Sequence, residues 1–309
     1  MKNATFRQLR VFNEVAKRLS FVRAAEQLHL TPPAITMQIK ELEGHVGFPL
    51  FERTGKKVSL TSGGEYMLVF ARKILATLKD AEDAAARLQR AETGVLVIGM
   101  VGTAQYFMMQ MLAVFRRLHP GVETQMAIGN REQLLKMLQD NEVDMAIMGH
   151  PPKEMRTRVE PFAAHPLVFV SSVDHPLRGQ GRLRVEHLND LDFIVREPGS
   201  GTRAAMEKFF TDARVEPRLS MQVQSNETLK QAVMAGLGLG FVSLHTIGNE
   251  LTQQKIAMLE VEGAPVVRAW NVVHTQSKML SPAAEAFRSF MLEQGDLFLN
   301  QQFGHWVPV

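Results

Sequence analysis

The sequence predicts two unlike parts: a small all-α winged helix-turn-helix domain at the N-terminus, continued by a long helix, and a larger α/β body. Three observations predict this architecture. Apolar residues recur at helical spacing in the first part, interrupted by one short turn; an unbroken helical pattern follows; and apolar runs then alternate with helical patterns to the end. A length of 309 residues suits two domains, because single cores stop growing at roughly 250–300 residues.

Composition excludes several classes of protein. Without cysteine the chain has no disulfide framework, thiolate nucleophile, cysteine-ligated zinc or thiolate-held iron–sulfur cluster. The longest apolar stretch, residues 232–244, is shorter than the ~18 residues that a membrane-spanning helix needs. The first 20 residues carry charges throughout and no apolar core of a signal peptide. We therefore expect a cytoplasmic protein with no membrane partner.

The charge is distributed unevenly along the chain. The whole chain has a net charge of +3, whereas residues 1–62 hold ten basic and five acidic side chains, a net +5 that leaves −2 for residues 63–309. A small basic module attached to a slightly acidic body is typical of a nucleic-acid-binding protein with a separate regulatory part.

The first 62 residues follow the order of a helix-turn-helix. An amphipathic pattern from Phe6 to Leu19 ends just before Ser20, a good N-cap for a second short helix. A tight connector at residues 29–31 leads to a third helix with Pro32 at its first position, and Gly47 ends that helix. The helix after the tight turn has the size that fits a DNA major groove.

A β-hairpin wing follows this third helix. The chain runs through residues 48–51 to a basic tip with Arg53, Lys56 and Lys57, then returns through residues 58–61. The tip suits contact with DNA phosphates. The alternative is a generic helical bundle that carries a basic hairpin.

Three segments of this part, 24–31, 33–43 and 47–53 with Leu60-Thr61, resemble the DNA-binding signature of LysR-type transcriptional regulators. The resemblance implies that the start of the third helix reads bases and the wing contacts the backbone. Pro32 stands where that family commonly has glutamine, so this position lacks an amide to pair with adenine. The candidate DNA-binding residues are Thr31, Pro32, Pro33, Thr36, Met37, Lys40, Arg53 and Lys56.

From Gly64 to about Ala91 a helical pattern continues without proline or further glycine, and it carries a heptad repeat. The repeat predicts a dimerisation seam, with a helix packed on its own domain as the alternative. The resemblance implies dimerisation, which places two recognition helices on successive half-sites. The expected domains are 1–62, 63–92 and 93–309. The seam consists of Met67, Ala71, Ile74, Leu78, Ala81, Ala85 and Leu88.

The body alternates strand and helix patterns, which predicts a parallel α/β architecture of two units with a ligand cleft at the carboxyl ends of the strands. No catalytic signature is found in it, and Gly236–Gly240 precedes a strand, which favours a close-packed turn over a nucleotide-binding loop. The expected strands are 95–101, 122–128, 145–148, 167–173, 193–196, 219–223 and 239–244, and the expected helices are 104–118, 131–139, 202–213 and 227–235.

One loop, Arg196–Arg203, follows a strand and opens a helix. Its glycines let backbone N–H groups converge, its hydroxyls and Arg203 add donors, and a helix N-terminus favours an anion. The alternative is an ordinary glycine-rich turn with a capping hydroxyl. The loop predicts a small ligand that carries a phosphate or carboxylate. The candidate effector-binding residues are Gly102, Thr103, Gln105, Asn130, Arg131, His150, Ser200, Gly201, Thr202, Arg203 and Asn226.

Segments 129–135, 138–141, 148–152, 196–203 and 225–236 resemble the CbbR group of LysR-type regulators, which control CO2-fixation (RuBisCO) operons. The resemblance implies a type-2 periplasmic-binding-protein-like sensor of two subdomains. Subdomain I spans about 93–162 and 268–309, subdomain II about 163–267, and crossover strands lie near 160–166 and 264–270.

The same resemblance implies a homo-oligomeric activator, dimer or tetramer, of CO2-fixation genes. Its partners are double-stranded promoter DNA, RNA polymerase and a non-covalent effector: a phosphorylated sugar or acid, or NADPH. No cofactor, metal or catalysis is expected. Relatives often carry lysine at the position of Gln105 and arginine at that of His150, so two cations are missing here and a bisphosphate is less expected. His150 is expected to make binding sensitive to pH.

Other functions remain open at this point. One alternative is a LysR-type regulator of another carbon-metabolism or transport operon. A solute-binding protein is a second alternative, opposed by the missing export signal and the basic helix-turn-helix. An enzyme on the same α/β scaffold is a third, which turnover surviving deletion of residues 1–92 would support.

Overall fold

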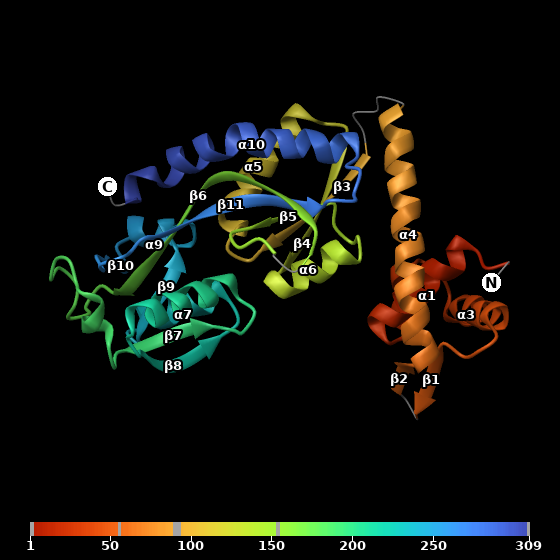
Figure 1. Cartoon of the computed structure of the whole chain (residues 1–309), viewed down its shortest axis with the longest axis horizontal. Helices are drawn as coiled ribbons and strands as arrows, with labels where there is room; N and C mark the ends of the chain where they lie inside the picture. The colour runs from red at the N-terminus through yellow and green to blue at the C-terminus, as the bar shows by residue number, and fades with distance from the viewer. Residues whose placement is uncertain (1–2, 55–56, 89–93, 153–154, 308–309) are drawn as a thin grey trace. The chain divides into compact units, whose positions relative to one another are not determined.

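The computed structural model describes residues 3–54, 57–88, 94–152 and 155–307. The chain forms two compact units, Met1–Ala85 and Ala86–Val309 (Figure 1). Most of the helix expected as a separate linker at 63–92 therefore belongs to the N-terminal unit.

The N-terminal unit is the expected winged helix-turn-helix. The predicted caps form: the side chains of Ser20 and Thr31 each accept a backbone N–H, and Gly47 ends the third helix with a φ of +87°. Thr5 caps the first helix in the same way. Its elements are α1 (Phe6–Arg18), α2 (Phe21–Gln27), α3 (Pro32–Val46), β1 (Phe51–Thr54) and β2 (Lys57–Leu60), with β1 and β2 antiparallel.

A single apolar core holds this unit together. Phe12 and Val15 of α1 are fully buried, and the small side chains of Ala24 and Ala25 let α2 approach closely. The wing is tied to α3 by Glu43, whose Oε1 accepts the backbone N–H of Leu50 at 2.8 Å. The position of the hairpin relative to the recognition helix is therefore fixed by a hydrogen bond as well as by packing.

The helix α4 (Ser62–Leu88) packs on this domain over its first turns. Met67 and Ala71, expected on a dimer seam, are buried in the domain's own core, and Ile74 packs against it. Ala81 and Ala85 are exposed further along, whereas the side chain of Leu88 lies outside the described residues. The first half of the heptad repeat therefore packs within the domain, because its apolar side chains complete the core of α1 to α3.

The second unit is built on a mixed sheet of nine strands among the described residues, in the order β4-β3-β5-β11-β6-β9-β7-β8 with β10 beside β6. Two parallel sets, β4-β3-β5 and β9-β7-β8, are joined by the long antiparallel pair β6 and β11. The alternation predicted the two parallel sets, and β6 and β11 overlap the two crossover strands that the resemblance implied. The strands are β3 (Gly94–Val101), β4 (Val122–Gly129), β5 (Met145–Met148), β6 (Thr157–Ser172), β7 (Asp192–Arg196), β8 (Arg218–Val223), β9 (Leu239–Ser243), β10 (Ile256–Leu259) and β11 (Val266–Thr275).

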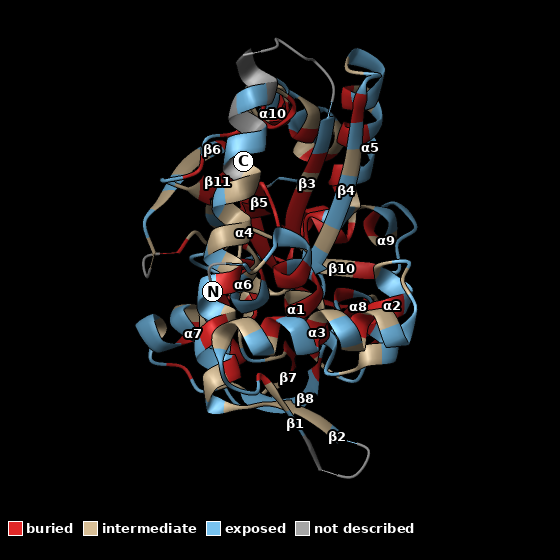
Figure 2. Cartoon of the chain, turned by 90° about the vertical axis from the view of Figure 1, so that its right-hand side faces the viewer, coloured by how far each residue is buried: buried red, intermediate tan, exposed pale blue. Residues whose placement is uncertain are grey.

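Helices cover both faces of each parallel set, so the unit has two subdomains linked by β6 and β11 (Figures 1 and 2). In one subdomain α5 and α10 pack on one face and α6 on the other; in the other, α7 faces α8 and α9 across the sheet. The helices are α5 (Gln105–Leu118), α6 (Arg131–Gln139), α7 (Gly201–Ala213), α8 (Asn226–Met234), α9 (Gly248–Thr252) and α10 (Pro282–Phe303).

The end of α10 does not stay within the subdomain that holds the rest of the helix. Phe303 packs edge-on against His245 at a centroid distance of 4.8 Å, and Trp306 packs on the core beneath α8. The chain's last described turn therefore contacts both subdomains, and the expected division at residue 268 is not a clean one there.

Candidate functional site

The start of α3 offers an exposed surface on the N-terminal unit. Ile35, Ile39 and Leu42 are buried on the inner side of the helix, which turns the other side outward. Thr36 is half-buried and its hydroxyl donates to the carbonyl of Pro32 at 3.0 Å. The remaining predicted residues of this helix and its cap are exposed: Thr31, Pro32, Pro33, Met37 and Lys40.

The structure thus brings six of the eight predicted DNA-binding residues onto one turn-and-helix segment. The other two are on the wing. Arg53 belongs to β1, but its side chain lies outside the described residues, as does Lys56 altogether. An exposed helix start with one cation, Lys40, and small polar and apolar groups has the shape and chemistry that a major groove accepts.

The second unit contains a cavity of about 480 Å³ between its two subdomains. It opens at the carboxyl ends of β3, β4 and β5 on one side and of β7 and β8 on the other, as the alternation of strands and helices predicted. Helices α5, α6, α7 and α8 all begin at this cavity, so their N-termini surround it. Ten of the eleven predicted effector residues line it: Gly102, Thr103, Gln105, Asn130, Arg131, His150, Ser200, Gly201, Thr202 and Asn226.

The loop before α7 forms one wall. Ser200 is the N-cap and its Oγ accepts the backbone N–H of Arg203 at 3.5 Å, while Ser200 and Thr202 are buried. Gly199 has a φ of +84° and lies against the carboxylate of Glu132 from the other subdomain. The loop therefore combines the predicted helix N-terminus with the capping role that was its alternative.

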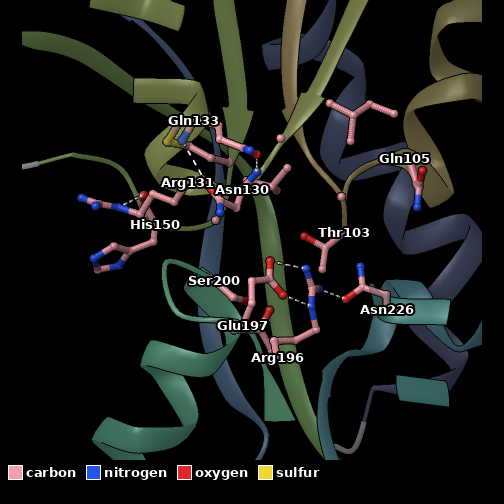
Figure 3. A pocket seen from close by; sticks show the side chains of 18 of the residues that line it. Thr103, Gln105, Asn130, Arg131, Gln133, His150, Arg196, Glu197, Ser200 and Asn226 are labelled. Carbon is pink, nitrogen blue, oxygen red and sulfur yellow. Dashed lines mark hydrogen bonds and ion pairs between the residues drawn. The ribbon is translucent and has the colours of Figure 1, made fainter. Parts of the chain in front are cut away.

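Arg196 is neutralised within the cleft (Figure 3). Its Nε and Nη2 donate to the two carboxylate oxygens of Glu197 at 2.8 and 2.9 Å, and its Nη1 donates to Oδ1 of Asn226. This arrangement turns the amide nitrogen of Asn226 toward Thr103, and that Nδ2 is buried without a hydrogen-bond partner among the described residues. Asn226 therefore presents a free donor, not an acceptor, to a ligand.

Asn130, Arg131 and His150 lie together at the end of the cleft where α6 begins. Arg131 donates from Nε to the carbonyl of His150 at 3.3 Å, and Asn130 forms a capping box with Gln133 at the start of α6. Gln105 is exposed at the start of α5, far from His150 in the view of Figure 3. The two positions that lost a cation relative to the resemblance thus lie at different ends of the cleft.

Arg203 is the one predicted effector residue that does not line the cleft. Its guanidinium is bound to Glu207 at 2.7 Å, to the carbonyl of Arg196 at 3.0 Å and to Oε1 of Gln222 at 2.7 Å. The side chain therefore joins α7 to β7 and β8 from outside. Arg203 is next in sequence to the hydroxyls of Ser200 and Thr202, as predicted. As the third residue of α7, however, it points away from them because of the helical periodicity.

Two residues that the sequence analysis did not select line the cleft at its floor. His165 lies on β6 and Arg268 on β11, directly opposite each other in the antiparallel pairing. They are 103 positions apart in the numbering, so only the strand register brings them together. A search for cations near predicted crossover strands would have found Arg268, whereas nothing local distinguishes His165.

Two other kinds of site were searched for in the part of the chain that the structure describes. It contains no cluster of three or more histidine, aspartate or glutamate side chains placed to hold a metal ion. None of its helices is both long enough and apolar enough to cross a membrane.

Both units match known protein families. Residues 6–65 match the bacterial regulatory helix-turn-helix family of the lysR type, and residues 89–296 match the LysR substrate binding domain. The chain is 46% identical to the HTH-type transcriptional regulator CfxR of Cupriavidus necator, over 100% of this chain and 97% of that protein. It is 43% identical to a RuBisCO operon transcriptional regulator of Allochromatium vinosum, over 94% and 97% of the two chains.

Among solved structures, the second unit is similar to the regulatory domain of CcmR from Synechocystis PCC6803, determined in complex with 2-PG. The identity is 34% and the TM-score 0.63, over 65% of this chain and 97% of that one.

Proposed function

Because the chain belongs to the LysR family of bacterial transcriptional regulators, we propose that it binds the promoter of a CO2-fixation operon and controls it in response to a small acidic metabolite. Support for the operon comes from full-length relatives whose names assign them to RuBisCO operons. Activation, RNA polymerase as a further partner and a cytoplasmic location are part of the proposal. Since these relatives are regulators, no enzymatic activity is proposed.

The exposed start of α3 carries the DNA-binding part of the proposal. Met37 is 54% exposed although it is a large apolar side chain, and Pro32 and Pro33 are exposed beside it. Apolar groups of this kind contact the thymine methyl in the major groove, and Lys40 is placed for a phosphate. We propose that Thr31 to Lys40 read the operator and that the basic wing contacts its backbone.

Dimerisation is proposed through a different face of α4 from the one that the heptad repeat predicted. Tyr66, Val69 and Phe70 are exposed, at 68%, 66% and 44%, on the side of the helix away from the core, and the rings of Tyr66 and Phe70 lie 5.2 Å apart. Their i, i+3 and i+4 spacing makes one apolar stripe, which we call the α4 stripe. A second copy of the chain would cover it and pair the two recognition helices; a tetramer would pair two such dimers.

The effector proposed is 2-phosphoglycolate, or a phosphorylated acid of similar size, as the CcmR complex suggests. The cleft has the volume of a small-molecule site and offers converging donors from α7, Thr103 and Asn226. A phosphorylated sugar or NADPH remains the second possibility for the ligand and is included in the test.

The test is DNase footprinting and gel-shift titration of the full chain on the promoter adjoining its gene. Titrations are run alone and with 2-phosphoglycolate, ribulose bisphosphate, phosphoenolpyruvate or NADPH. We expect protection of two half-sites and a change in footprint with one metabolite. Lys40→Ala should weaken binding evenly across DNA sequences and lower the salt dependence by about one released counterion, whereas Lys208→Ala, on the exposed side of α7, should change neither. An unchanged footprint with every metabolite would refute the effector assignment.

A further inference from the structure

The floor of the cleft is formed by the strands that connect the two subdomains. His165 of β6 and Arg268 of β11 are register partners, so their side chains lie on the same face of the sheet, and both line the cavity. We call β6 and β11, which join the two subdomains, the hinge strands. A ligand group that reaches this floor contacts the hinge strands, whereas groups held by α7 or by Thr103 contact one subdomain only.

Arg268 is a half-buried cation with no carboxylate of its own. Its Nη1 donates to the carbonyl of Gly201 at 2.9 Å, and among the described residues no aspartate or glutamate pairs with it. Burial lowers the pKa of its guanidinium, which nevertheless stays protonated in proteins. The other deep arginine of the cleft, Arg196, is matched by Glu197. A desolvated charge is costly unless it is paired, so Arg268 is suited to receive an anion from a ligand.

His165 beside it provides an independent sign of a ligand. The imidazole is only 4% exposed and stacks on Trp270 at 3.8 Å, yet neither ring nitrogen has a hydrogen-bond partner among the described residues. Burial, with the charge of Arg268, holds the pKa of His165 well below its ordinary value, so the neutral ring carries one N–H to donate. Glycine at 149 allows this position, because a Cβ there would collide with Nδ1.

We propose that Arg268 and His165 bind the carboxylate of the effector while the N-terminus of α7 binds its phosphate. The pair offers one positive charge and one neutral donor, which matches a singly charged carboxylate. The backbone N–H groups of Gly201 and Thr202, in the first turn of α7, match the larger phosphate. The hydrogen bond from Nη1 of Arg268 to the carbonyl of Gly201 sets the two subsites next to each other, which suits a small phosphorylated acid. The inference rests on the proposed function and names its ligand class.

The arginine is tested by comparing two ligands in the full-length protein. Trp306→Phe leaves Trp270, stacked on His165, as the only tryptophan and hence as a fluorescence reporter of the floor. Dissociation constants are measured for 2-phosphoglycolate and for ethyl phosphate, which lacks the carboxylate. We expect Arg268→Gln to weaken 2-phosphoglycolate binding about tenfold or more and ethyl phosphate binding by less than about twofold. Arg268→Lys should fall between, and Arg184→Gln, which removes an exposed arginine of the same unit, should change neither.

The histidine is tested by His165→Phe, which keeps an aromatic ring against Trp270 but removes both nitrogens. We expect binding of 2-phosphoglycolate weakened by about fivefold to tenfold with no loss of thermal stability, since two unpaired buried nitrogens are removed. Equal losses for both ligands, or unchanged binding in Arg268→Gln or His165→Phe, would overturn the floor assignment and leave the proposed function standing. A wild-type protein that binds neither ligand would overturn the effector part of that function together with this inference.

Discussion

At the scale of single residues, a buried ion pair between Lys278 and Asp144 connects three segments of the first subdomain. Nζ of Lys278 lies 2.9 Å from Oδ1 of Asp144, and both side chains are at most 3% exposed. Oδ2 of the same aspartate accepts the backbone N–H of Val97 at 2.7 Å. The pair therefore joins β3, the turn before β5 and the segment before α10.

We predict that Lys278→Met lowers the free energy of unfolding by about 3–5 kcal/mol, because it leaves a buried carboxylate without its cation. The control is Lys208→Met, which breaks an exposed pair with Asp212 and should cost less than about 1 kcal/mol. Both are measured by urea denaturation at neutral pH. Similar losses in the two variants would show that burial of the Lys278 pair has no energetic consequence.

A second residue-scale prediction concerns acid stability. Burial lowers the pKa of His245 to about 4, and its Nδ1 accepts a hydrogen bond from Nε1 of Trp270 at 3.0 Å. The unfolded chain takes up a proton near the ordinary pKa of about 6.5, whereas the folded chain resists it. Stability is thus fully present above pH ~6.5 and declines as the pH falls toward 4, by about 3 kcal/mol in total.

Thermal melts between pH 8 and pH 4.5 test this dependence. We expect His245→Gln, which cannot titrate but still offers an oxygen to Trp270, to lose less stability over that range than the wild type. Carboxylates titrate equally in both proteins, so the difference between the two curves isolates the histidine. Parallel curves would contradict the assignment.

At the scale of elements, α4 shows how one helix can carry two apolar faces with different partners. The face with Met67 and Ala71 completes the domain core, and the α4 stripe of Tyr66, Val69 and Phe70 is exposed. Val69→Glu should raise the dimer dissociation constant at least about tenfold by burying a charge in the proposed seam. Val22→Glu, at a valine of α2 that is 55% exposed, is the matched control. The dimer dissociation constants of the two variants are measured by sedimentation velocity of the full chain. Equal effects of the two substitutions would show that the α4 stripe is not part of the dimer interface.

The elements that the sequence predicted best are those whose ends are marked locally. Helix α6 and strand β5 have the predicted bounds, because an asparagine capping box opens one and four consecutive buried residues make the other. The apolar pattern alone predicted this strand only from residue 167, because Pro161 lies inside β6, and the part near 160–166 came from the resemblance. The structure accommodates this proline at an irregularity in the pairing with β11, between Trp270 and Asn271, where a ladder hydrogen bond is not required.

Other parts of the structure have no local signal at all. Helix α10 was not predicted: it packs by apolar residues on several sides and contains Gly295, which lies against the ring of Phe162 where a Cβ would collide. The cleft walls were predicted because they stand at strand ends and helix starts, which sequence marks. The floor was not, since His165 and Arg268 meet only through a register between distant strands.

At the scale of the whole second unit, the two subdomains contact each other outside the hinge strands as well. Lys230, in the middle of α8, is 4% exposed and binds Glu250 at 2.7 Å and Glu227 at 2.9 Å. Its Nζ lies 4.8 Å from the ring centre of Tyr106 on α5. The tyrosine follows Gln105 at the edge of the cleft, and the lysine lies one turn beyond Asn226. This cation–π contact therefore joins the two subdomains beside the cleft, and we expect it to favour their closed arrangement.

Removing the ring should make the closed state less populated. A partly desolvated cation–π contact contributes roughly 0.5–2 kcal/mol, so Tyr106→Leu is expected to weaken 2-phosphoglycolate binding by between about twofold and thirtyfold, mainly through faster dissociation. Arg184→Gln, at an exposed arginine of the same unit, is the control and should leave ligand binding unchanged. The two rates are measured by stopped-flow fluorescence of Trp270. If Tyr106→Leu instead slowed association and left dissociation unchanged, the contact would act on ligand entry, and closure of the cleft would depend on the hinge strands and the ligand alone.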